Sequence, residues 1–224
     1  NSAEMIANKW GLSREEMEAF AVASHHRAQA AWDNGWFDSE VAPMAELDKD
    51  ETIRPQTNME GLAGLRTVQE GGIITAGISS QNCDGAAALL VASERAVKEH
   101  NLKPRARVHH ISVRADDPVW MLTAPIPATE YALKKAGMTV ADIDLFECNE
   151  AFASVPMAWM KELGIPHEKV NIHGGGIARV IRYDQRSDGA IIGKYRKIHL
   201  PGHADHRRSQ CETPRRHARP GRCQ

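Results

Sequence analysis

The chain has 224 residues, of which 42% are hydrophobic and 25% charged, and its formal net charge is −1. These values are typical of a globular protein with a substantial core, and they exclude a collagen-like or wholly disordered chain. No apolar run approaches the ~20 residues of a membrane-spanning helix and no signal peptide opens the chain, so no membrane partner is expected. The four cysteines lack a CxxC pair, which argues against a disulfide framework and favours a reducing, cytoplasmic setting.

Charge is distributed unevenly along the chain. Residues 179–224 contain 12 Lys and Arg against 4 Asp and Glu, whereas residues 1–178 contain 16 against 25. Because the stretch after residue 207 has almost no apolar side chains, it cannot form a core, and we predict a largely disordered basic tail behind a folded body. A basic tail attracts nucleic acid, but this one has no interleaved aromatic residues, so no nucleic-acid partner is expected.

Periodicity and punctuation predict alternating helices and strands along the body. We expect helices over 13–32, 59–65, 86–97, 127–136 and 151–163, and strands over 71–77, 105–113 and 143–147. The first long helix begins at a capping box, in which Ser13 and Glu16 satisfy free backbone amides. The helix over 86–97 is rich in Ala and Leu and is expected to be mostly buried. Alternation of strand and helix indicates the α/β fold class.

Five motifs, in order, resemble the thiolase family. They are SAE at residues 2–4 with the helix start at Ser13, TAGISSQNCDGAAA at 75–88, PIPA at 125–128, CNEAFA at 148–153 and NIHGG at 171–175. Residues 114–118 are most similar to acyltransferases of lipid or steroid breakdown. The resemblance implies the layered αβαβα thiolase fold, incomplete here. Residues 1–106 would end its N-terminal half, residues 107–178 would begin its C-terminal half, and residues 179–224 would be a non-thiolase tail.

The resemblance also implies a chemistry, acyl transfer on coenzyme A thioesters. A cysteine thiolate takes the acyl group, a histidine activates it and a second cysteine moves a proton. The partners are then acyl-CoA substrates, with coenzyme A as group carrier, no resident cofactor and no metal. Asn149 of the CNEAFA motif would position the water that contributes to the oxyanion hole. The alternative is an N-cap at a strand-to-helix turn.

Three further residues match family positions that bind the substrate. Ser80 matches a serine near the pantetheine arm, and Arg54 an arginine near the adenine end, where a guanidinium can face phosphate or stack on a ring. Met121 matches a residue that lines the acyl pocket. The alternatives are a loop hydroxyl, a solvated surface arginine and a core methionine. Because intact thiolases are usually dimers or tetramers, a homo-oligomer is expected.

The catalytic parts of the family are missing from this sequence. The nucleophilic cysteine belongs to the first half of a thiolase, so this chain begins after it. Cys83 and Cys148 occupy other motifs and are expected to be buried, inert thiols. Neither Cys211 nor Cys223 is followed by the glycines that accompany the second catalytic cysteine.

The catalytic histidine should lie in a Leu-Gly-His-Pro string after Ala178, where the chain instead reads Arg179-Val180-Ile181-Arg182. Deleting one base from CTG GGT CAT CCG gives the codons of these four residues. A frameshift is therefore our hypothesis for the missing histidine. The sequence is best interpreted as a thiolase-family acyltransferase fragment that is inactive as this chain.

The tail carries a competing resemblance. Residues 193–203 (GKYRKIHLPGH) are similar to nitrilase-superfamily amidohydrolases, especially N-carbamoyl-D-amino-acid hydrolases, and Lys197 matches a lysine of their active site. The similarity covers about 20 residues near 188–207 and lacks the partner glutamate and cysteine. The alternatives are therefore an amidohydrolase fragment or a non-enzymatic chimeric product. Three histidines with metal-like spacing belong to this string and are not expected to bind zinc: His199, His203 and His206.

Overall fold

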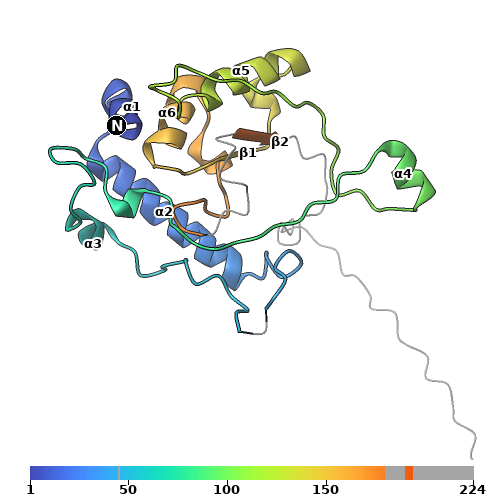
Figure 1. The fold of residues 1–224 in the computed structure, drawn as a ribbon, viewed down its shortest axis with the longest axis horizontal. Helices are drawn as coiled ribbons and strands as arrows, with labels where there is room; N and C mark the ends of the chain where they lie inside the picture. The colour runs from blue at the N-terminus through green and yellow to red at the C-terminus, as the bar shows by residue number, and fades with distance from the viewer. Residues whose placement is uncertain (45, 180–189, 194–224) are drawn as a thin grey trace, which may run out of the picture.

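The computed structural model describes residues 1–44, 46–179 and 190–193, and most of the predicted tail lies outside them (Figure 1). The α-helices are α1 (Ser2–Trp10), α2 (Arg14–Asp33), α3 (Met59–Ala63), α4 (Glu94–Glu99), α5 (Pro125–Ala136) and α6 (Ser154–Leu163). Short 3-10 turns are η1 (Ala76–Ile78), η2 (Val140–Asp142) and η3 (His167–Lys169). The strands β1 (Leu145–Cys148) and β2 (Ala190–Gly193) pair antiparallel, with Leu145 opposite Gly193.

The longest helix, α2, begins where the sequence predicts it. The Ser13 hydroxyl accepts the N–H of Glu16 at 3.1 Å, and the Glu16 carboxylate accepts the N–H of Ser13 at 2.8 Å. This confirms the capping box and the helix predicted over 13–32. The helices predicted over 59–65, 127–136 and 151–163 form as α3, α5 and α6, and the strand over 143–147 forms as β1, each shifted by a few residues.

The main hydrophobic core lies between the helices and β1. Phe146 of β1 and Trp159 of α6 are both under 2% exposed, and their rings meet edge to face with centroids 5.6 Å apart. The Trp159 indole N–H donates to the Thr129 hydroxyl of α5 at 2.9 Å, so its polar atom is satisfied inside the core. In Figure 1, α5 and α2 lie on opposite sides of β1, which places this strand in the middle of the body.

The strand predicted over 71–77 is wrong. Glu4 of α1 accepts the backbone N–H groups of Ile73 and Ile74 at 3.0 and 2.9 Å, and the chain then turns into η1. A carboxylate on a helix thus takes the donors that a neighbouring strand would have used. The β-branched composition of this run predicted a strand, but the hydrogen-bond partner was decided by tertiary structure.

The helix predicted over 86–97 and the strand predicted over 105–113 are also wrong. Only α4 forms in the first range, and the second is irregular. The burial expected for residues 86–97 is absent as well, because Leu89 is 88% exposed. Ile111 of the second range is 76% exposed. Apolar segments gain regular structure mainly by burying a face. The large apolar side chains of both stretches stay exposed instead, although the second stretch contacts α5, where the Ser112 hydroxyl donates to the Ala128 carbonyl at 3.2 Å. Figure 1 shows α4 standing away from the body between these two stretches.

Local stability should therefore differ sharply between this region and the body. Among residues 1–179, we expect trypsin to cut first after Arg105 and Arg107, because the backbone there has no hydrogen bonds within the described structure. Arg27 is the internal control, since it lies in α2 and donates to the Val170 carbonyl at 2.8 Å. Mass spectrometry of a digestion time course gives the order of cuts. Cleavage after Arg27 that is as early as cleavage after Arg105 and Arg107 would contradict this account.

Candidate functional site

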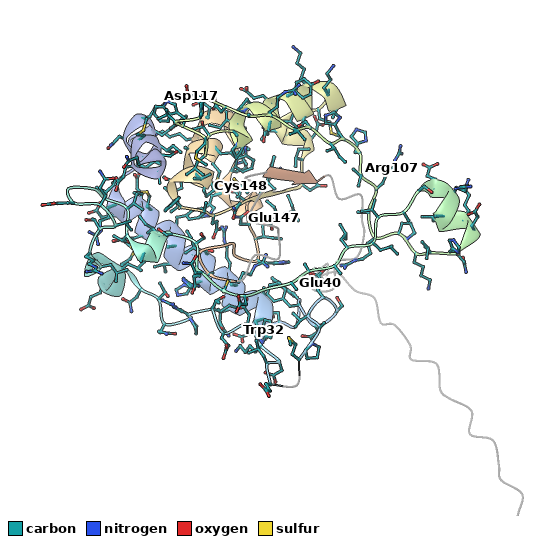
Figure 2. The ribbon with its side chains drawn as sticks, viewed as in Figure 1. Trp32, Glu40, Arg107, Asp117, Glu147 and Cys148 are labelled. Carbon is teal, nitrogen blue, oxygen red and sulfur yellow. The ribbon has the colours of Figure 1, made fainter. Side chains whose placement is uncertain are left out.

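Sequence motifs that lie far apart in the chain meet at the carboxyl end of β1. The Ser80 N–H donates to the Ala151 carbonyl at 2.9 Å, and the Gln81 N–H donates to the Gly176 carbonyl at 3.2 Å. Residues 80–81 therefore join the CNEAFA motif to the glycine turn. Figure 2 shows Glu147 and Cys148 of β1 near the centre of the body, whereas Arg107 lies on the outlying stretch next to α4.

A buried carboxylate holds this meeting point together. Glu150 is 1% exposed, and its Oε2 accepts from the Ser24 hydroxyl of α2 at 2.7 Å and from the Ile177 N–H at 3.2 Å. Its Oε1 accepts from the Asn171 amide at 2.8 Å. The same amide donates to the Cys148 carbonyl at 2.8 Å, and Asn171 Oδ1 accepts the Cys148 N–H at 2.9 Å. Helix α2, the end of β1 and the glycine turn are thus tied through one side chain.

The glycine turn is shaped to approach this carboxylate. The Gly175 N–H donates to the Ser24 hydroxyl at 3.0 Å, and a Cβ at this glycine would collide with the Glu150 carboxylate. Gly174 has a φ of +73°, and a Cβ there would lie 2.5 Å from the Ser24 carbonyl oxygen. Gly175 is therefore required because a side chain has no space there. Gly174 is required both for space and for its left-handed backbone conformation.

Burial dominates the electrostatics of this site. It raises the pKa of Glu150, although hydrogen bonds from Asn171 and Ser24 act in the opposite direction. It also raises the pKa of the fully buried Cys148 thiol, which disfavours the thiolate form. The burial expected for Cys148 is confirmed. Cys83 is only half-buried, but desolvation raises the pKa of its thiol too.

Asn149 lies between β1 and Glu150, and its side chain is partly buried. It lines a small cavity together with Leu122, Pro125, Ala151 and Val155. Asn149 does not cap α6, because the N-cap of that helix is Ala153, so the N-cap alternative is wrong. Within the described part of the chain, no hydrogen bond engages the Asn149 amide. A donor and an acceptor are therefore left at the edge of this cavity.

A larger groove of about 410 Å³ opens beside the same loop, and Met121 lines it together with Phe152 and residues from the chain start. This volume falls within the range of small-molecule sites. Met121 is 51% exposed, so it is not a core methionine. The Ser80 backbone bonds to Ala151, and Met121 lines the same groove as Phe152. Ser80, Asn149 and Met121 therefore surround residues 151–152, although the Ser80 side chain itself is exposed.

Arg54 lies apart from these residues. Its side chain is exposed, and its backbone N–H donates to His25 Nδ1 at 3.1 Å. Burial, with a smaller effect of Arg54, lowers the pKa of His25 to about 4, so a neutral imidazole accepts this bond. No contact among the described residues joins Arg54 to Asn149 or Met121.

Sequence reasoning missed the residues that organise the site. Glu150 and Asn171 lie inside quoted motifs, but the motifs alone assigned them no role. Ser24 lies in the helix predicted over 13–32, on its buried face, and a hydroxyl on such a face signals a buried hydrogen bond. Across the described ranges, no cluster of three or more His, Cys, Asp and Glu could hold a metal ion. No helix in these ranges is both long and apolar enough to cross a membrane.

In the described body, helices pack around a short sheet, and a polar loop lies at the end of the central strand. This arrangement is of the α/β class. Models of two known domain families match the chain. The model for the thiolase N-terminal domain matches residues 1–95, and the model for the thiolase C-terminal domain matches residues 102–179. The chain therefore belongs to the thiolase family, as its five motifs predict. The division at residue 106 stays a prediction.

Relatives and solved structures agree with this assignment. The steroid 3-ketoacyl-CoA thiolase of Mycobacterium tuberculosis is 54% identical over 180 residues, which are 79% of this chain and 44% of that protein. The 3-ketoacyl-CoA thiolase of Aliivibrio fischeri is 46% identical over 191 residues, 79% of this chain and 49% of that protein. The chain spans about half the length of these relatives.

Among solved structures, human mitochondrial 3-ketoacyl-CoA thiolase in complex with CoA has a TM-score of 0.74 at 42% identity, covering 80% of this chain and 46% of that one. The Bacillus anthracis acetyl-CoA acetyltransferase has a TM-score of 0.77 at 37% identity, covering 81% and 48%. The thiolase-like α/β fold is thus confirmed. The nitrilase-like resemblance near 188–207 finds no support, and apart from 190–193 it lies outside the described residues, as do its histidines.

Glu147 should make stability depend on pH. Burial raises its pKa to about 7 from an ordinary 4.5, with Arg179 opposing the shift and Glu150 adding to it. The folded state therefore binds this proton more tightly, and its contribution to stability is fully present below pH 4.5 and lost as pH rises to about 7. The loss is on the order of 3 kcal/mol. In urea unfolding measured across this pH range, Glu147→Gln should remove most of the decrease in unfolding free energy with rising pH. Asp144→Asn, at an exposed position, should keep this decrease. If Glu147→Gln leaves the pH dependence of the unfolding free energy unchanged, Glu147 is not its source.

The Glu150 network should dominate stability at the site. Glu150→Ala leaves the Ser24, Asn171 and Ile177 donors buried without an acceptor, at about 1–3 kcal/mol each before relaxation. We expect a total loss of about 3 kcal/mol or more in urea unfolding. Glu150→Gln keeps one acceptor and should lose less. Glu70→Ala, at an exposed loop residue, is the control and should change stability by less than about 0.5 kcal/mol. A loss from Glu150→Ala as small as that of the control would refute the network's role.

Proposed function

We propose that this chain supplies part of the active site of a 3-ketoacyl-CoA thiolase, an enzyme of Claisen-type acyl transfer between coenzyme A thioesters. One observation carries the proposal: the Asn149 amide lines a cavity beside a groove, free of described hydrogen bonds, on a loop fixed by the buried Glu150. An uncharged amide offers a donor and an acceptor, which suits it to hold a water molecule against a developing negative charge.

In this mechanism Asn149 orients a water whose hydrogen faces the thioester oxygen as that oxygen becomes an enolate. Such a group is effective only when it is held in place before the charge develops. The Glu150 network supports this, because both neighbours of Asn149 are bonded to buried partners, Cys148 through its backbone and Glu150 through its side-chain carboxylate. The amide then needs little reorganisation during the reaction.

The other predicted residues take their places around this point. Met121 would line the acyl pocket within the groove, and Ser80 would approach the pantetheine arm from the segment beside Ala151. Arg54, exposed on its own loop, would meet the phosphate or adenine end of coenzyme A. The substrates are then acyl-CoA thioesters of lipid or steroid breakdown. In this proposal the enzyme works without a resident cofactor, as a homo-oligomer in the cytoplasm.

The 224-residue chain by itself is proposed to be inactive. The nucleophilic cysteine is not among its motifs, and Cys148 is buried with a raised thiol pKa. The C-terminal thiolase match ends at residue 179, where the string expected to carry the histidine would begin. The frameshift hypothesis concerns residues 179–182, of which only Arg179 lies in the described structure.

A segment exchange tests the function directly. Residues 1–178 replace the matching part of the M. tuberculosis steroid thiolase, which supplies the rest of the enzyme. We expect this hybrid to thiolyse acetoacetyl-CoA, and we expect Asn149→Ala in the hybrid to lower kcat by roughly 10²–10³-fold, as for other oxyanion-hole groups. Asn8→Ala, at an exposed asparagine of α1, is the matched control and should leave kcat unchanged.

The 224-residue chain alone should show no thiolysis above buffer. A folded hybrid, with the oligomeric state of the parent enzyme but no activity, would overturn the proposed function. Equal kcat values for the Asn149→Ala and Asn8→Ala hybrids would overturn the role of Asn149.

A further inference from the structure

The side chain of Gln81 lies where two segments far apart in the sequence come together. Its amide nitrogen donates to the Thr52 carbonyl at 2.8 Å and to the Ile177 carbonyl at 2.9 Å. The Ala178 carbonyl is farther from the same nitrogen, at 3.4 Å, and the Thr52 hydroxyl also reaches this carbonyl at 3.4 Å. Thr52 is 29 residues from Gln81 and Ile177 is 96 residues from it, so one amide joins two distant segments.

The nature of the acceptors explains why an amide suits this position. A primary amide nitrogen has two hydrogens, so it can donate to two backbone carbonyls at once. A hydroxyl has a single hydrogen and a carboxylate has none, whereas an ammonium group would place a charge in a partly buried position. Replacing Gln81 by a side chain without donors therefore leaves both carbonyls without this partner.

The first of the two segments is the loop over residues 50–54. Ile53 is 9% exposed and packs against Ala178, at the end of the glycine turn. The Arg54 N–H donates to the imidazole of His25 on α2, as described above. The loop is thus seated on α2 next to the glycine turn, and the Gln81 amide bonds to it two residues before Arg54.

The second segment is the end of the glycine turn. Gln81 bonds to it twice, because its backbone N–H donates to the Gly176 carbonyl at 3.2 Å and its side chain to the Ile177 carbonyl. The string that carries the catalytic histidine in the thiolase family is expected directly after Ala178. Ser80, the residue before Gln81, bonds through its backbone to Ala151. Gln81 therefore touches both segments that flank the predicted pantetheine contact.

We propose that Gln81 is a positioning residue that sets the spacing between the loop of Arg54 and the glycine turn, so that one coenzyme A molecule engages both. The inference rests on the proposed function for the roles of Arg54 and of the string after Ala178. Coenzyme A is held at its adenine end and reacts at its thiol end. A shift of one segment relative to the other therefore misplaces the reacting thiol. Gln81 acts through the Thr52 and Ile177 carbonyls rather than on the substrate itself.

The hybrid enzyme described above tests the consequence for the substrate. Gln81→Met keeps the length of the side chain and removes both donors. With saturating acetoacetyl-CoA, the acyl acceptor is either coenzyme A or pantetheine, which lacks the adenine end. We expect Gln81→Met to lower the preference for coenzyme A, measured as the ratio of the two acceptor kcat/KM values, roughly tenfold. Gln29→Met is the matched control and should leave this ratio unchanged, since the Gln29 amide donates to Asp33 within α2.

A second variant shows whether Gln81 acts through the loop of Arg54. Arg54→Ala alone should lower the same ratio, because it removes the contact with the adenine end. Combining Arg54→Ala with Gln81→Met should lower the ratio little further, because the two changes disturb one arrangement. A merely structural role of Gln81 would reduce the yield of folded hybrid or lower both kcat/KM values equally, and would not move their ratio.

Amide exchange in the 224-residue chain measures the positioning without relying on activity. We expect Gln81→Met to speed exchange of the Arg54 and Ala178 amides roughly tenfold, because each lies within two residues of a carbonyl that Gln81 holds. In the unaltered chain these amides donate to His25 and to the Gly175 carbonyl. The amides of α6 should exchange as in the unaltered chain, which shows that the variant is folded.

Four results would overturn the proposal. They are unchanged exchange at Arg54 and Ala178, equally accelerated exchange throughout α6, an active hybrid whose preference for coenzyme A is unaffected by Gln81→Met, and an equal loss of preference with Gln29→Met. An inactive unaltered hybrid defeats the proposed function instead. Exchange in the 224-residue chain then still decides whether Gln81 holds the two segments together.

Discussion

The buried carboxylate of Glu150 is the constraint on which the candidate site depends. An ionisable group in the interior is costly unless its oxygens are hydrogen-bonded, so the surrounding chain must deliver donors to it. Those donors come from α2 and from both ends of the glycine turn. By satisfying one residue, the fold fixes three segments that are distant in the sequence. Asn149, next in the chain, derives its position from this arrangement.

The rest of the chain divides into a region that completes its own packing and a region that does not. Around Trp159 and Phe146, helices and β1 cover one another and satisfy their polar atoms. Across residues 82–116, regular structure is limited to α4, which buries none of its residues. Both regions belong to the thiolase family matches, so the difference lies in which neighbours are available rather than in the character of the sequence.

The sequence predicted what is decided locally. The capping box at Ser13 and the left-handed glycines Gly137 and Gly164 set helix ends where they were expected. The apolar run at 86–91 was assigned to a helix, because a short run without periodicity does not distinguish a helix from a buried strand. Sequence motifs identified Asn149 through its family resemblance. They could not show that Ser24, 126 residues away from Glu150, shares its carboxylate, because no local pattern records that contact.

The most direct test of this account is a double-mutant cycle between Ser24→Ala and Asn171→Ala, measured by urea unfolding. The two side chains are bonded to opposite oxygens of Glu150, and Ser24 also accepts the Gly175 N–H. The same cycle in the Glu150→Ala background isolates the coupling that passes through the carboxylate. The strain at Asn171, with a φ of +48°, enters both arms of the cycle and cancels. A shared network predicts a coupling free energy of about 1 kcal/mol or more. Additivity within about 0.3 kcal/mol would show that Glu150 does not couple α2 to the glycine turn, and would contradict the account.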